Sequence, residues 1–81
     1  EFRRVLFRSF LYYHGSIIQG TFNGKGKLYH SNKKLKYFGY WKNGKKHGVG
    51  VEFDEFASII NNGMWNNNKL VDNKKDYILN I

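Results

Sequence analysis

The chain has 81 residues, of which 41% are hydrophobic, 19% aromatic and 25% charged. This length suits one small domain and excludes a multidomain enzyme, and so many aromatic residues exclude an ordinary disordered tail. The chain contains no cysteine, which excludes disulfides and thiolate metal sites, and no apolar run is long enough to span a bilayer. Its net charge of +8 favours an anionic partner.

The first nine residues, 1–9, read EFRRVLFRS and resemble a translated sequencing-library adapter. We therefore expect this segment to be non-native, and we leave it out of the fold prediction as one leaves out a cloning scar. The alternative interpretation is a basic amphipathic arm, in which Arg3, Arg4 and Arg8 flank three apolar residues and contact a membrane or a nucleic acid. Residues 10–81 are then expected to form a single repeat region that belongs to a longer protein.

Within residues 10–81, glycine and aromatic residues recur at a fixed offset of 24 positions. This period divides the region into units at 13–36 and 37–60 and an incomplete third unit at 61–81, which has lost several glycines. We expect the recurring positions to be structural: Tyr13, Gly15, Gly20, Gly24, Gly26, Tyr37, Gly39, Trp41, Gly44, Gly48, Gly50, Gly63 and Trp65.

The middle unit indicates the local structure most clearly. An aromatic run, Tyr37–Lys42, precedes Asn43-Gly44, which is a strong signal for a tight hairpin turn because both residues tolerate positive φ. Residues 48–53 then alternate, with valine and phenylalanine on one face and glycine and glutamate on the other. These two segments predict a β-hairpin. Apolar residues nowhere keep a helical period, so we expect an all-β fold.

Polar segments at 31–36, 54–58 and 66–68 are expected to connect successive hairpins into one elongated antiparallel sheet. Both ends of such a sheet are open edges, where another chain can pair.

The recurring glycines have two expected roles. Gly20 and Gly44 provide the positive φ that the turns need. Gly15, Gly39 and Gly63 lack a side chain, so that neighbouring aromatic rings can lie on the backbone there. Ladders of aromatic rings between units are therefore expected to form the core.

The segment YFGYWKNGKKHGVG of the middle unit resembles the MORN repeat, the membrane occupation and recognition nexus motif, at every defining position. The first unit departs from the motif at Ile17 and Gln19, and the third keeps only Gly63, Trp65 and Asn67. The resemblance covers residues 13–70. It implies an elongated sheet of hairpins within a longer array, which serves as a scaffold, a dimerisation surface or a contact for anionic lipid, often beside another domain.

Other chemical motifs are weak. Residues 39–46 match a phosphate-binding loop except that Lys46 stands where Ser or Thr would bind magnesium, and the repeat already explains both glycines. The three histidines share no metal-ligand spacing, so we expect no metal site and no cofactor. Glu52, Asp54 and Glu55 are expected to form a solvated rim rather than an acid–base pair. We therefore expect no catalytic residues and no enzyme activity.

Positive charge is concentrated in the first unit, since residues 10–36 carry five lysines and no acid. One interpretation is a lysine strip along the hairpin tips that binds anionic phospholipid or an acidic partner; the other is a solvated face that protects the sheet from aggregation. The absence of arginine after residue 9 disfavours nucleic acid. The lysines of this strip are Lys25, Lys27, Lys33, Lys34, Lys36, Lys42, Lys45 and Lys46.

Three functions follow from this sequence. The first is a non-catalytic scaffold module that binds a protein partner or a second copy of itself. The second is a peripheral membrane module that binds phosphoinositide or another anionic phospholipid through the lysine strip. The third is a regulatory repeat region attached to an enzyme domain outside this chain. Each function places the chain inside the cell, in the cytoplasm or at the cytoplasmic face of a membrane.

Overall fold

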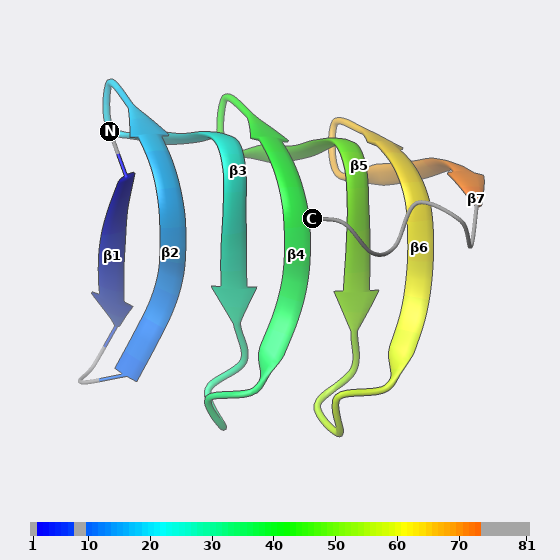
Figure 1. Ribbon diagram of the computed structural model, residues 1–81, viewed down its shortest axis with the longest axis horizontal. Helices are drawn as coiled ribbons and strands as arrows, with labels where there is room; N and C mark the ends of the chain where they lie inside the picture. Colours follow the sequence, from blue (N-terminus) through cyan, green and yellow to red (C-terminus); the bar gives the residue numbers. More distant parts are fainter. Residues whose placement is uncertain (1, 8–9, 74–81) are drawn as a thin grey trace.

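The computed structural model describes residues 2–7 and 10–73, so the remaining ends of the segments predicted at 1–9 and 61–81 lie outside the described residues. Seven β-strands form one antiparallel sheet in chain order, each pairing with the next (Figure 1). This arrangement confirms the predicted all-β sheet of successive hairpins. The strands are β1 (Phe2–Phe7), β2 (Phe10–Ile18), β3 (Thr21–Tyr29), β4 (Leu35–Lys42), β5 (Lys45–Phe53), β6 (Ile59–Asn66) and β7 (Lys69–Asn73).

The hairpin turns are tight and repeat with the sequence period. Both central residues of each turn have positive φ: Gln19 and Gly20 (52° and 80°), Asn43 and Gly44 (53° and 81°), and Asn67 and Asn68 (51° and 71°). Two residues of positive φ define the type I′ turn, whose twist matches that of the flanking strands. The third unit keeps this turn without glycine because asparagine tolerates the left-handed region better than other residues.

The connectors between hairpins repeat in the same way. Lys33 and Ala57, 24 positions apart, both have positive φ (74° and 70°). Each lies in a turn closed by equivalent hydrogen bonds, with the His30 N–H donating to the Lys34 carbonyl oxygen and the Asp54 N–H to that of Ser58. The connectors predicted at 31–36 and 54–58 are correct at their centres, although Leu35 and Lys36 belong to β4. The connector predicted at 66–68 is wrong, because Asn66 belongs to β6 and Asn67 and Asn68 form the tight turn of the β6–β7 hairpin.

The ends of β3 and β5 that follow the tight turns bend across the sheet instead of continuing along it (Figure 1). The bends coincide with Gly24 and Gly48, whose φ values of 85° and 90° favour glycine. Each bent end is held by the following turn: the Gly44 N–H donates to the Phe22 carbonyl oxygen (2.9 Å), and the Asn68 N–H donates to the Lys46 carbonyl oxygen (3.0 Å). Neighbouring units are therefore joined at their turns as well as along their strands.

A row of paired glycines crosses the middle of the sheet, and the core lies on it. The row consists of Gly15, Gly26, Gly39, Gly50 and Gly63, each paired with the next. A side chain on Gly26 would overlap the ring of Tyr13, and one on Gly50 would overlap the ring of Tyr37. The predicted packing of rings on glycine backbone is thus confirmed, but at Gly26 and Gly50 and not at Gly15 and Gly39. At Gly15 and Gly39 an added side chain would first meet the backbone of the adjacent strand.

The buried aromatic residues satisfy their polar atoms with backbone groups. The Tyr13 and Tyr37 hydroxyls donate to the carbonyl oxygens of Ser16 (2.9 Å) and Tyr40 (3.0 Å). The Trp41 indole N–H donates to the Gly26 carbonyl oxygen (3.2 Å), and 24 positions later the Trp65 indole does the same at Gly50 (3.0 Å). Tyr37 packs edge-on against Trp41 and Trp65. The predicted aromatic ladder between units is therefore present in the core.

Burial raises the pKa of the Tyr13 hydroxyl to about 12, and it raises the pKa of the Tyr37 hydroxyl above its ordinary value. The charged form of a phenol loses hydration in an apolar setting. Both hydroxyls therefore stay protonated and keep donating to the backbone at neutral pH.

The segment that the prediction left out of the fold forms β1, which pairs with β2, and Val5 packs against the core. Without β1, this edge of β2 would have unpaired backbone groups, to which an extended segment adds readily. However, β1 does not follow the period. Phe2, not glycine, stands 24 positions before Gly26, and the pairing of Val5 with Tyr13 is shifted by one residue from the pairing of Leu28 with Tyr37.

Candidate functional site

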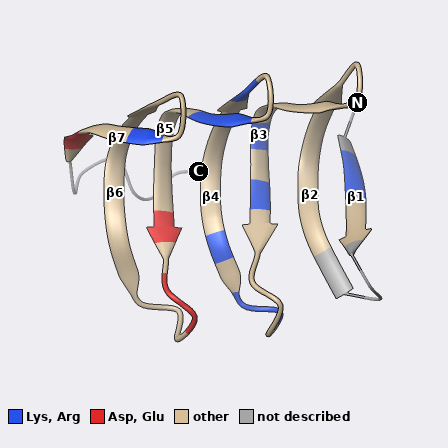
Figure 2. Ribbon diagram, turned by 180° about the vertical axis from the view of Figure 1, so that it is seen from behind, with Lys and Arg blue, Asp and Glu red and all other residues tan. Residues whose placement is uncertain are grey.

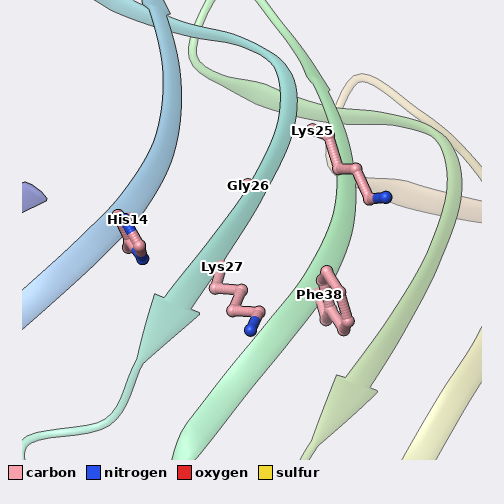
Figure 3. A pocket seen from close by; sticks show the side chains of 5 residues that line it. All are labelled: His14, Lys25, Gly26, Lys27 and Phe38. Atoms are coloured by element: carbon pink, nitrogen blue, oxygen red, sulfur yellow. The ribbon is translucent and has the colours of Figure 1, made fainter. Parts of the chain in front are cut away.

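The sheet has an aromatic face, which carries Tyr13, Tyr37, Trp41 and Trp65, and an opposite face. On the opposite face His14 of β2 pairs with Lys27 of β3, which pairs with Phe38 of β4. With Lys25 and Gly26 these side chains line a hollow of about 290 Å³. Figure 3 shows its lysine side chains extending from β3 toward β4, with Lys27 directed at Phe38. We call this site the basic hollow.

The charge of the basic hollow is not balanced by any nearby carboxylate of β1 to β4, because residues 2–51 contain no aspartate or glutamate. The Lys27 ammonium lies 5.0 Å from the centre of the Phe38 ring, within the range of a cation–π contact. Lys25 is exposed, whereas Lys27 and Phe38 are half-buried. The arrangement therefore presents two cations beside an apolar wall.

The eight lysines of the predicted strip do not form one strip. Lys36 and Lys42 lie at opposite ends of β4, and Figure 2 shows positive segments near both ends of this strand and along β3. The structure sorts the lysines into the connector end (Lys33, Lys34 and Lys36), the opposite face of β3 (Lys25 and Lys27) and the turn end (Lys42, Lys45 and Lys46). The reason is that alternate strands run in opposite directions, so lysines close in sequence separate to opposite ends of the sheet.

The Lys46 ammonium makes its contacts within the core. Its ammonium lies 2.7 Å from a Glu52 carboxylate oxygen, and both side chains are less than one-fifth exposed (15% and 19%). It also lies 5.3 Å from the Tyr37 ring centre and 4.9 Å from that of Trp65. The Asn61 side-chain amide donates to the other Glu52 oxygen (2.7 Å). Lys46 is therefore a structural residue and not part of a binding surface.

Burial opposes ionisation of Glu52, but the hydrogen bonds from Lys46 and Asn61 outweigh it and hold the pKa of this carboxyl below its ordinary value. The predicted solvated rim is thus wrong for Glu52. It is right for Glu55, which is exposed, while Asp54 accepts hydrogen bonds from the N–H groups of Phe56 and Ser58 and closes the connector.

The positions 24 residues before Lys46 and Glu52 are Phe22 and Leu28, which also pack in the core. Phe22 stacks on Tyr13 with ring centres 3.6 Å apart. The second unit thus replaces two apolar side chains by an ion pair at the same place. Comparing the units position by position would have revealed this exchange, whereas counting charges along the chain did not.

The outermost strands of the described sheet, β1 and β7, each pair on one side only. On β7, Val71 is 63% exposed, and Lys69 and Asp72 are exposed beside it. These strands offer backbone hydrogen-bonding groups to another strand, which is the basis of β-augmentation.

Within the part of the chain that the structure describes, no group of three or more His, Asp or Glu side chains is placed to hold a metal ion. The same residues include no helix of the length and apolarity that crossing a membrane requires. No protein-family model matches the chain, and neither a curated protein nor a solved structure matches it.

Proposed function

We propose that the chain is a non-catalytic scaffold module built from MORN-type repeats, which assembles with a second sheet of the same kind through its open edges. The observation that carries this proposal is that the core of one unit is completed by the next. Trp41 of the second unit bonds to Gly26 of the first, and Trp65 of the third bonds to Gly50 of the second. A repeat array of this kind is extended by adding further hairpins at its edges.

Among the residues that the structure describes, β1 and β7 each pair with one strand only, and this supports the same function. Each presents an extended backbone, and the exposed Val71 adds an apolar contact to the β7 edge. Strand addition at such an edge derives its affinity from main-chain hydrogen bonds, with side chains supplying specificity. A scaffold of this kind needs no cofactor and no catalytic group.

The experiment is sedimentation velocity on residues 1–81 over a range of concentrations at low and high salt. We expect a concentration-dependent dimer or larger assembly that persists in high salt, because it rests on backbone and apolar contacts. Val71→Lys should shift the equilibrium to the monomer by placing a charge on the pairing edge. Ile18→Lys is the matched control, since Ile18 is 54% exposed but lies at a hairpin end. A chain that stays monomeric at every concentration would refute the proposal.

A further inference from the structure

The two lysines of the basic hollow are not required by the repeat. The residues 24 positions after Lys25 and Lys27 are Val49 and Val51, which occupy the equivalent places on β5. The same fold therefore accepts an apolar pair there, and valine suits a β-strand better than lysine does. The first unit alone carries this pair of cations, so the charge of the hollow is a local departure from the repeat.

The positions of the two lysines suit one anionic group. Lys25 and Lys27 are alternate residues of one strand, so their side chains leave the same face about 7 Å apart. Neither has an ion-pair partner within the described residues, and Glu52, the first acid that follows them in sequence, is held by Lys46 on the other face. Two flexible ammonium groups at this spacing can close on the oxygens of a single phosphate.

The hollow also has an apolar wall. Phe38 is half-buried on the neighbouring strand, with the Lys27 ammonium beside its ring. Gly26 contributes only backbone to the floor, because the place of its missing side chain is on the aromatic face, under Tyr13. A planar ring can pack against Phe38 at the usual offset separation while a charged substituent reaches the lysines. The volume of about 290 Å³ fits one ring with its substituent.

We propose that the basic hollow binds a phosphate monoester carried on an aromatic ring, with the phosphate between Lys25 and Lys27 and the ring against Phe38 (Figure 3). His14 closes the side of the hollow next to Lys27. This site is independent of the scaffold function, because it uses a sheet face and leaves both edges available.

The test is calorimetric titration of residues 1–81 with phenyl phosphate at physiological salt, beside inorganic phosphate and phenol. We expect a Kd of roughly 0.1–1 mM for phenyl phosphate, at least fivefold weaker binding of inorganic phosphate, and no measurable binding of phenol. Lys25→Val with Lys27→Val, which copies the second unit, should weaken binding at least tenfold. Lys42→Val with Lys45→Val removes the same charge at the turn end and should change the Kd less than twofold.

Phe38→Leu keeps an apolar side chain and should remove the preference for phenyl phosphate over inorganic phosphate. A short phosphotyrosine peptide, whose phosphate is carried on an aromatic ring, and a nucleoside 5′-monophosphate, whose phosphate is carried on the sugar, form two further arms, and the peptide should bind more tightly. The proposal is overturned if phenyl phosphate does not bind, if the two double variants weaken binding equally, or if only vesicles of acidic phospholipid bind. Far-UV circular dichroism on each variant verifies that the sheet is intact.

Discussion

The ring-on-backbone contact predicts that a single methyl group in the glycine row destabilises the fold strongly. In Gly50→Ala the new carbon would overlap the Tyr37 ring, so the ring or the strand must move. Overpacking of this kind costs about 1–3 kcal/mol, and displacing Tyr37 also costs the hydrogen bond to the Tyr40 carbonyl, about 1 kcal/mol. We expect a total loss of about 2–4 kcal/mol, which is most of the stability available to so small a domain.

The assay is urea unfolding followed by tryptophan fluorescence and far-UV circular dichroism. Gly44→Asn is the matched control, since nothing lies within 4 Å of a side chain there and Asn68 already occupies the equivalent turn position. We expect it to change the free energy of unfolding by less than about 0.5 kcal/mol. In the double variant Tyr37→Leu with Gly50→Ala the two effects should be non-additive by about 1 kcal/mol or more. Equal midpoints for Gly50→Ala and Gly44→Asn would refute the reasoning.

Three further predictions concern the ion pair, the indole and β1. Folding lowers the pKa of the Glu52 carboxyl. The stability that this carboxylate contributes is therefore present above the ordinary carboxyl pKa and is lost as the pH falls through the pKa of the folded state. The wild type should thus lose more stability between pH 5 and 3 than Lys46→Phe with Glu52→Leu, while Glu52→Leu alone should cost about 1–3 kcal/mol at pH 7; equal acid sensitivity of wild type and double variant would count against the ion pair. Trp65→Phe should cost about 1 kcal/mol or more by leaving the Gly50 carbonyl without its indole donor, and an unchanged urea midpoint would contradict this. Removing residues 1–9 should keep the far-UV spectrum and lower the free energy of unfolding by at most about 2 kcal/mol, because Val5 is the side chain that this segment packs against the core among those that the structure describes. Loss of all β-structure would show that the segment is integral to the sheet.

The sequence was sufficient to predict the class of fold, the hairpin turns and the units, because each depends on local chemistry repeated at a fixed offset. Asn43-Gly44 specifies its turn within two residues, and the turn at Gly20 follows by the same offset. The turn at Asn68 was mistaken for a connector, because asparagine replaces the glycine that marks the turn in the other two units.

The register across the sheet was not predictable in this way. Near the first turn Ile17 pairs with Phe22, but beyond the bend Gly15 pairs with Gly26. β3 therefore has two more residues than β2 in this stretch. A register extended from the turn would place Lys25 opposite His14, where the structure has Lys27. For the same reason the rings were expected on the wrong glycines, and the basic hollow was not recognised as one site.

The most direct test of the central claim is a proton NMR spectrum of residues 1–81 with the glycine signals assigned. The Tyr13 and Tyr37 rings lie on Gly26 and Gly50, so the α-protons of these two glycines should be shifted strongly upfield and show nuclear Overhauser contacts to the tyrosine rings. Gly20 and Gly44, which have open space around them, should resonate near their ordinary positions. If all four glycines resonate together and no contact to a tyrosine ring is seen, the account of rings packed on paired glycines is wrong.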